Sequence, residues 1–185
     1  KKKVHLGSGK RYIPNFIHVD LDDFPHIDYR SKISELPFFE NNSIDLIYCC
    51  HAFEYLDREE ADKALDEWFR VLKKGGVLRL SVPNFKSIIE VYKKYKNLEH
   101  RGILGPLYGR MPIKSQDGDI TLYHRTVYDF KSLKGKLEKS SFSDIKEWDW
   151  SMTEHKDVDD FSQAYIPHLD KKHGILISLN IEAIK

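Results

Sequence analysis

A strand, helix, strand unit in the first half of the chain limits its fold more than any other feature. Residues 44–50 form a nearly continuous apolar run, which is typical of a strand covered on both faces. Asp57 can cap the helix that follows, and the glycine pair at 75–76 permits a left-handed stop before a strand at 77–82. Because strands alternate with helices, we expect an α/β fold with a mainly parallel sheet and helices on both faces.

Further elements extend this pattern toward both ends of the chain. Residues 4–6 predict a strand that runs into the turn Gly7-Ser8-Gly9, and residues 16–21 predict a second strand soon afterwards. The residues between these two strands are too few for a full crossover helix, so the first crossover is shortened. Beyond the central unit, the spacing predicts helices at 87–95 and after Asp129, then strands at 145–148 and 175–184.

Length and composition indicate one soluble domain. The 185 residues fit a single domain at 1–185, with a Gly-rich insert at about 100–125 and an Asp- and His-rich loop at about 151–173. Thirty Lys and Arg against 29 Asp and Glu give a net charge of +1, so no global field marks a nucleic-acid or membrane binder. A mean hydropathy of -0.54, with no apolar run near 18 residues, excludes a transmembrane span.

The cysteines and the first residues bear on location. Cys49 and Cys50 are adjacent and are the only cysteines, so we expect neither a disulfide framework nor a CxxC metal pair. The amino-terminal lysines have no apolar stretch behind them and do not read as a signal peptide. We therefore expect a cytoplasmic protein.

Ligands of open parallel sheets bind at the carboxyl ends of the strands, so those ends are the places to search. At the first strand end, Gly7-Ser8-Gly9 lets backbone N–H groups approach a ligand. At the second, Asp20 can accept hydrogen bonds from both hydroxyls of a ribose. In the alternative interpretation, the glycines only turn the chain and Asp20 only caps a loop.

Four motifs, taken in order, resemble the class I S-adenosylmethionine-dependent methyltransferases, in particular those of the type 11-like group. The likeness covers nearly the whole chain, and the order of the motifs makes it specific. The matching stretches are residues 4–9, residues 19–20, the stretch 33–47, and residues 51–56 together with 70–78. The resemblance implies a Rossmann-like, doubly wound sheet of seven strands whose last strand, at 175–184, is antiparallel and pairs with 145–148.

The same resemblance implies S-adenosylmethionine as cofactor and assigns residues to its binding. Gly7, Ser8 and Gly9 would line its methionine end, Asp20 would hold its ribose, Ile33 would lie against adenine, and His51 would face the sulfonium. The full set of expected cofactor-binding residues is Gly7, Ser8, Gly9, Asp20, Leu21, Lys32, Ile33, Cys50 and His51. The sequence departs from the family at His5 and Lys32, where acidic residues are common, and in the shortened first crossover.

Methyl transfer to an alcohol or a neutral amine requires a base, and histidine suits this task near neutral pH. His51 is the first candidate because it follows a strand end, and His124 is the second because it ends the Gly-rich insert. Tyr108 and Tyr123 can position a substrate or anchor the core. The segment 159–165 predicts a lid or acceptor wall, with a solvated loop as the equal alternative.

The expected function is transfer of a methyl group to a small-molecule or glycan-type acceptor, without nucleic acid, membrane or metal. The alternative is a non-catalytic binding or regulatory protein that keeps the fold, and His5 and Lys32 keep it open. A nicotinamide dehydrogenase is disfavoured because Tyr12 stands where the third glycine of its fingerprint is needed. The sequence does not identify the acceptor or the oligomeric state.

Two further groups of residues, one of histidines and one of lysines, have both a functional and a simpler interpretation. His155, His168 and His173 share one loop, but their spacing matches no zinc motif, so we expect a chance cluster. The basic run at 93–96 can touch a phosphate-bearing acceptor, although a solvated helix face fits it better.

Overall fold

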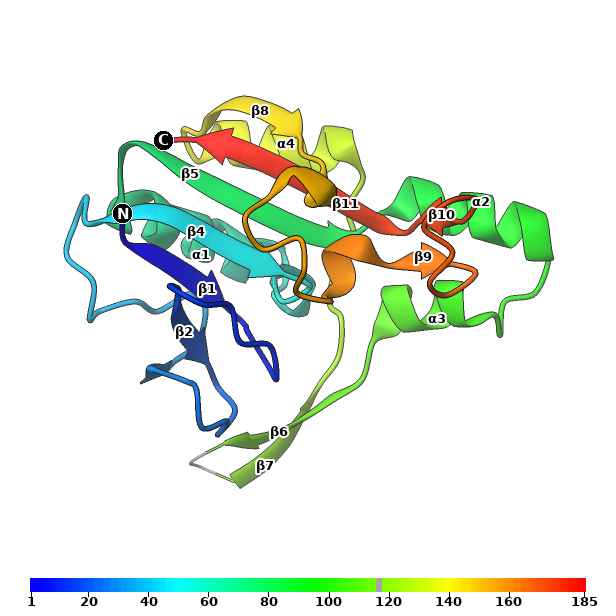
Figure 1. Cartoon of the computed structure of the whole chain (residues 1–185), viewed down its shortest axis with the longest axis horizontal. Helices are drawn as coiled ribbons and strands as arrows, with labels where there is room; N and C mark the ends of the chain where they lie inside the picture. Colours follow the sequence, from blue (N-terminus) through cyan, green and yellow to red (C-terminus); the bar gives the residue numbers. More distant parts are fainter. Residues whose placement is uncertain (116–117) are drawn as a thin grey trace.

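The computed structural model describes residues 1–115 and 118–185, and a seven-stranded mixed sheet forms its centre (Figure 1). In spatial order the strands are β3 (Tyr29–Arg30), β2 (Ile17–Asp20), β1 (Lys3–Leu6), β4 (Ile44–Cys50), β5 (Leu72–Pro83), β11 (Ser178–Ile184) and β8 (Ser143–Glu147). The pairs from β3 to β5 are parallel, whereas β11 is antiparallel to both β5 and β8. The mostly parallel sheet with an antiparallel last strand is therefore confirmed.

Strand β4 lies at the centre, as its apolar run predicts. Its side chains alternate between the two faces: Ile47 and Cys49 enter one buried cluster, and Tyr48 and Cys50 enter another. All of the last five residues of the strand are buried. A strand buried on both faces needs no polar alternation, which explains its continuous apolar sequence.

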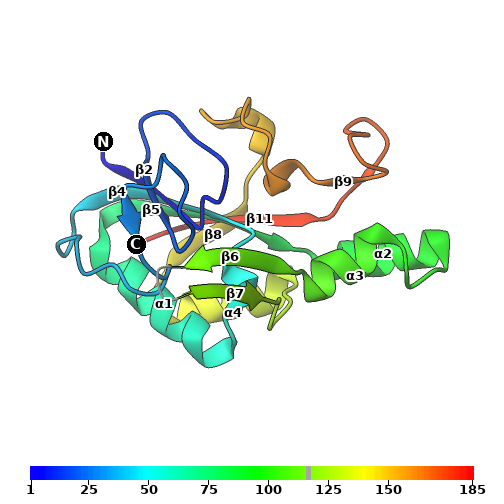
Figure 2. The same ribbon diagram turned by 90° about the horizontal axis from the view of Figure 1, so that it is seen from below.

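The first face of the sheet is covered by two helices, α1 (Arg58–Val71) and α4 (Phe130–Lys139), which Figure 2 shows on the same side. Helix α1 begins with a capping box, in which the Asp57 carboxylate accepts from backbone N–H groups and the Glu60 side chain accepts from the Asp57 N–H. Its Trp68 is fully buried and donates to the Ile33 carbonyl at 2.7 Å. This bond fixes the chain near the carboxyl edge of the sheet to the helix beneath.

We expected helices on both faces of the sheet, and the cover of the second face differs from this expectation. Within the described residues, the segments 10–16 and 149–164 cover it, and the latter contains only the short turns η2 (Trp150–Met152) and η3 (Phe161–Gln163). The chain between β1 and β2 is too short for a helix to pack across the sheet. Aromatic rings fill the space instead: Tyr48 lies 5.1 Å from His5 and 4.3 Å from His155, measured between ring centroids.

The remaining elements are short or lie outside the central sheet. They are η1 (Phe53–Tyr55), α2 (Phe85–Tyr95), α3 (Arg101–Tyr108), the hairpin of β6 (Met111–Ser115) and β7 (Gly118–Leu122), and the short pair of β9 (Tyr165–Ile166) and β10 (Ile175–Leu176). The Gly-rich insert at about 100–125 forms α3 and this hairpin, with residues 116 and 117 outside the described part. The single-domain organisation stays a prediction.

Candidate functional site

The turn after β1 brings backbone close to the exit of β4. Gly7 and Gly9 have φ values of 63° and 53°, a region that favours glycine. A Cβ added to Gly7 would lie 2.3 Å from the Ala52 Cβ, whereas one added to Gly9 would meet nothing within 4 Å. Space therefore remains beside Gly9, where a ligand can approach the backbone.

This difference predicts unequal costs for two matched substitutions. Gly7→Ala is expected to lower the free energy of unfolding by about 3 kcal/mol, since it adds a clash with Ala52 to the left-handed strain. Gly9→Ala adds the strain alone and should cost about 1 kcal/mol. Urea unfolding of both variants measures the difference, and equal losses would contradict the packing of Gly7 on Ala52.

Asp20 ends β2 and is held by two backbone groups. Its Oδ2 accepts from the Gly9 N–H and its Oδ1 accepts from the Asp22 N–H, each at 2.8 Å. A carboxylate offers about four acceptor positions, so both oxygens keep one for a ligand hydroxyl. Asp20 thus caps the loop, as the simpler interpretation held, and its geometry also fits the ribose of the expected cofactor.

The other residues expected at the cofactor are placed unequally. Ile33 lies beside the glycine turn, with its Cγ2 3.7 Å from a Cβ built on Gly7. Lys32 is largely exposed and pairs with Glu35 at 3.1 Å. Leu21 follows Asp20 and is half-buried, while the Cys50 side chain is buried among apolar residues on the second face. Burial raises the pKa of the Cys50 thiol well above its usual range.

His51 follows β4 in a left-handed conformation, with φ of 51°. Its N–H donates to the Ser81 carbonyl at 2.9 Å, and its Nε2 lies 2.6 Å from the Ser178 hydroxyl. These bonds hold a non-glycine residue in a region that costs free energy. The imidazole is therefore fixed at the carboxyl edge of the sheet.

The structure joins the two predicted histidines through a carboxylate that the sequence reasoning did not single out. Glu54 is fully buried, and its Oε1 lies 3.3 Å from His51 Nδ1 and 3.7 Å from His124 Nε2. Among the described residues, neither of its carboxylate oxygens has a hydrogen-bond partner. The only signal in the sequence was the spacing. Glu54 stands three residues after His51, and side chains three residues apart lie on the same side of a single helical turn.

The surroundings of Glu54 show the effect of its burial. Tyr55 and Tyr128 lie near it, and burial raises the pKa of both phenols, with the charge of Glu54 as a further cause; that of Tyr128 reaches about 12. His124 is held on its other side, because its Nδ1 donates to the Pro106 carbonyl at 2.8 Å. A Cβ on Gly109 would lie 2.3 Å from His124 Nε2, so the ring packs directly on that glycine.

The segment 159–165 borders this group on the second face. The Phe161 ring lies 5.3 Å from the His51 ring, and the Arg11 guanidinium stacks on Phe161 at 4.7 Å. The Ser178 hydroxyl donates to the Phe161 carbonyl as well as contacting His51. The placement fits the predicted acceptor wall, and whether the segment moves as a lid stays a prediction.

Tyr108 and Tyr123 are 64% and 52% exposed, so they do not anchor the core.

Of the three histidines weighed as a metal site, His155 is buried on the second face and His173 is exposed beside Asp170. Within residues 1–115 and 118–185, no three His, Cys, Asp or Glu side chains gather as metal ligands would.

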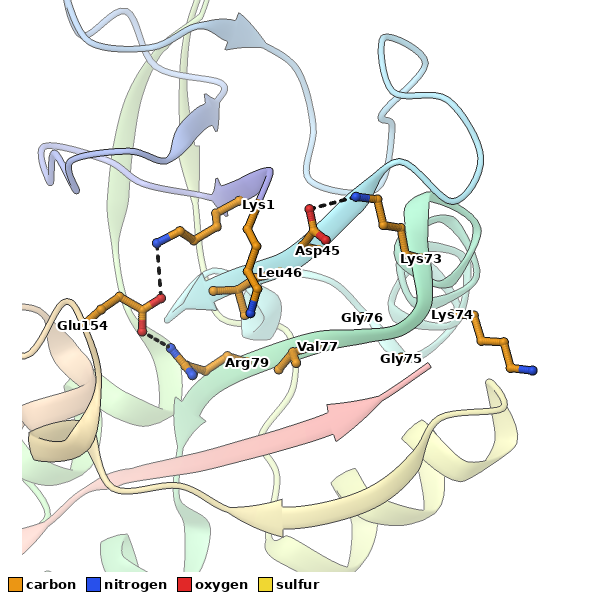
Figure 3. Close-up of a pocket in the computed structure, with 11 residues that line it drawn as sticks. Lys1, Asp45, Leu46, Lys73, Lys74, Gly75, Gly76, Val77, Arg79 and Glu154 are labelled. Carbon is orange, nitrogen blue, oxygen red and sulfur yellow. Dashed lines mark hydrogen bonds and ion pairs between the residues drawn. The ribbon is translucent and has the colours of Figure 1, made fainter.

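A hollow of about 520 Å³ lies elsewhere, at the amino ends of β1 and β4 (Figure 3). Four of its charged side chains form two ion pairs: Lys73 with Asp45 at 2.9 Å, and Arg79 with Glu154 at 3.1 Å. Ligands of open parallel sheets bind at the opposite, carboxyl edge. The group around Asp20 and His51 is therefore the better candidate site.

Comparison with known proteins agrees with this geometry. Residues 13–80 match the family model of a methyltransferase domain, a stretch that contains Asp20, His51 and Glu54 but begins after the glycine turn. No curated protein matches the chain. The family match and the fold confirm the resemblance to the class I S-adenosylmethionine-dependent methyltransferases, whose methyl donor is S-adenosylmethionine.

Solved structures of such enzymes share the fold. A methyltransferase from Archaeoglobus fulgidus has a TM-score of 0.58 at 15% identity, over 100% of this chain and 86% of its own. One from Thermotoga maritima has a TM-score of 0.56 at 16% identity, covering 100% and 82%. The 1,6-didemethyltoxoflavin-N1-methyltransferase of Burkholderia thailandensis, solved with its substrate and S-adenosylhomocysteine, has a TM-score of 0.55 at 12% identity, covering 99% and 70%. At these identities the likeness establishes the fold.

Proposed function

We propose that this chain transfers a methyl group from S-adenosylmethionine to a small-molecule or glycan-type acceptor. The observation that carries the proposal is the joint placement of Asp20 and Gly9. The Asp20 carboxylate accepts from the Gly9 N–H at 2.8 Å and keeps acceptor positions for a ligand. Open space lies beside Gly9. Both lie at the sheet edge where ligands of this fold class bind.

The proposal assigns the residues of this edge to separate parts of the cofactor. In the proposed site, Asp20 accepts hydrogen bonds from the ribose hydroxyls, the glycine turn contacts the methionine end, and Ile33 packs against the adenine. Leu21, Lys32 and Cys50 complete the expected set, although the exposed Lys32 and the core-facing Cys50 side chain contribute through their backbone. The cofactor supplies the reactive methyl carbon and a positively charged leaving sulfur.

The protein must align the acceptor and take its proton. We assign the proton-accepting role to His51 through its Nδ1, because its Nε2–H donates to the Ser178 hydroxyl, whose own proton goes to the Phe161 carbonyl. Glu54 lies 3.3 Å from that Nδ1 and between His51 and His124, and we assign it a positioning role. A carboxylate close to an imidazole stabilises the positive charge that the ring gains when it takes a proton from the acceptor. His124 stays the second candidate for the same role.

The acceptor class rests on the charge of the chain and on one solved structure. The net charge of +1 offers no global attraction for nucleic acid. The methyltransferase from Burkholderia thailandensis was solved with a small molecule bound, 1,6-didemethyltoxoflavin. A small acceptor that enters beside Phe161 fits this arrangement.

The alternative, a non-catalytic protein with this fold, depends on the departures at His5 and Lys32. His5 is buried against Tyr48 on the second face of the sheet, where it takes part in the packing of aromatic rings, so this departure is a weaker argument for the alternative. Lys32 keeps the alternative open, because it replaces an acidic side chain near Ile33 with an exposed lysine.

Calorimetric titration with S-adenosylmethionine and S-adenosylhomocysteine tests the proposal. We expect micromolar binding of both, and acceptors can then be screened with the loaded protein. His51→Gln should lower kcat for an acceptor found in this way by a larger factor than it lowers cofactor affinity. No binding of either ligand at millimolar concentration would refute the proposal and favour the non-catalytic alternative.

A further inference from the structure

Three large apolar side chains are exposed along one face of α2. Phe85, Ile89 and Tyr92 are 41%, 39% and 49% exposed, and their spacing of four and three residues places them in one stripe. The neighbouring face of the helix is buried through Ile88 and Val91, which pack with residues of α3 and of the strand ends. Helix α2 is thus apolar on two faces, and the fold covers one of them.

The exposure of these side chains is not evident from the sequence. The helical spacing of Ile88, Ile89, Tyr92 and Tyr95 alone would place them in one apolar stripe. In the structure the stripe is divided, because Ile88 is 3% exposed while Ile89 and Tyr92 face outward. Exposed apolar groups that lie together mark an interaction surface more often than single ones do.

Basic residues border the exposed stripe. Lys86 and Lys93 are seven residues apart, so they lie on one side of it, and Lys96 follows the helix end; all three are exposed. Glu90 is the only acidic residue of the helix. A helix with Phe, Ile and Tyr on one side and Lys beside them suits the interface between lipid headgroups and acyl chains.

We propose that the exposed face of α2 docks on an anionic membrane surface. The apolar stripe inserts among the headgroups, while Lys86, Lys93 and Lys96 bind the negative charge of the lipids. Pairing with a second copy through the same stripe is disfavoured, because it would bring like charges together. This is adsorption from one side: within the described residues, no helix is long and apolar enough to cross a bilayer.

The location of α2 gives the docking a consequence. The helix begins after Asn84, directly beyond the carboxyl end of β5, and β5 pairs with β4, whose exit carries His51 (Figure 1). Docking therefore brings the sheet edge that holds the candidate site close to the membrane.

Sedimentation of the whole chain with lipid vesicles tests the proposal without any cofactor, so its result is independent of the proposed methyl transfer. We expect binding to vesicles of phosphatidylcholine with phosphatidylserine, weaker binding as salt rises, and none to phosphatidylcholine alone. The double variants Phe85→Ser/Ile89→Ser and Lys86→Glu/Lys93→Glu should each lose more than about tenfold in affinity.

Matched controls alter the same residue types elsewhere. Met152→Ser removes a side chain that is 83% exposed, and Lys63→Glu/Lys131→Glu reverses two exposed lysines on α1 and α4; both should bind as wild type does. Circular dichroism verifies that each variant is folded. Absence of phosphatidylserine-dependent binding, or full binding by the folded Phe85→Ser/Ile89→Ser variant, overturns the proposal. A dimer that this variant dissociates would also overturn it, in favour of a second copy.

Discussion

Asp20→Ala is expected to weaken the binding of S-adenosylmethionine at least about a hundredfold. The substitution removes the carboxylate proposed for the ribose, and two hydrogen bonds to a charged acceptor account for about 3 kcal/mol or more. It also frees the Gly9 and Asp22 N–H groups, which loosens the glycine turn. Calorimetric titration measures the loss. The affinity for S-adenosylhomocysteine should fall by the same factor, since both ligands carry the ribose.

Two further variants separate binding from folding. Asp20→Asn keeps a carbonyl oxygen but replaces the other acceptor with an amide, so it should lose binding with a smaller loss of stability. Asp23→Ala removes a neighbouring exposed carboxylate that pairs with Arg30 at 2.6 Å, and it should bind as wild type does. Undiminished binding by a folded Asp20→Ala variant would refute the ribose assignment.

The central part of the fold could be predicted because local rules and tertiary structure agree there. The apolar run of β4 and the Asp57 cap each predict the element that the structure shows. The glycine pair at 75–76 was expected to stop the helix and does not, because α1 ends at Val71 and both glycines lie inside β5. The second face could not be predicted, because its cover has no periodic pattern. The segments that fill it are held by scattered contacts, such as the Tyr48 hydroxyl donating to buried Asp160 at 2.5 Å, between residues 112 positions apart.

The candidate site shows the same division. Gly7, Gly9 and Asp20 follow strand ends, so sequence reasoning could find them. The link between His51 and His124 depends on the path of the insert, which returns His124 to the exit of β4 and places Glu54 between the two rings. In the sequence Glu54 cannot be distinguished from an ordinary exposed polar residue, because only the structure shows that its carboxylate is buried.

The histidines of the second face predict a loss of stability in mild acid. Burial is the main cause that lowers the pKa of His5, His18 and His155, and the proximity of other histidines lowers the first two further. In the unfolded chain these groups titrate near a pKa of about 6.5. Below that pH the unfolded state binds protons that the folded state does not, so the free energy of unfolding falls with pH.

The three buried histidines also determine the pH range and the size of this loss of stability. Stability contributed by the neutral histidines is fully present above pH of about 6.5 and is lost as the pH falls below it. Each histidine contributes up to about 1.4 kcal/mol per pH unit, so three give a slope of about 4 kcal/mol per pH unit at most. Carboxylates with lowered pKa values, such as Asp62 and Glu67, act in the same direction but at lower pH.

His5→Phe is the variant that isolates this effect, because His5 is fully buried among aromatic rings and its Nδ1 has no hydrogen-bond partner in the described residues. Removing one proton-binding group should reduce the slope by about 1.4 kcal/mol per pH unit. Urea unfolding between pH of about 7.5 and 5 measures it. Phe16→Leu, which alters packing 6.5 Å from His5 without removing a titrating group, should lower stability equally at every pH. An unchanged slope in folded His5→Phe would mean that the buried histidines do not govern the acid response.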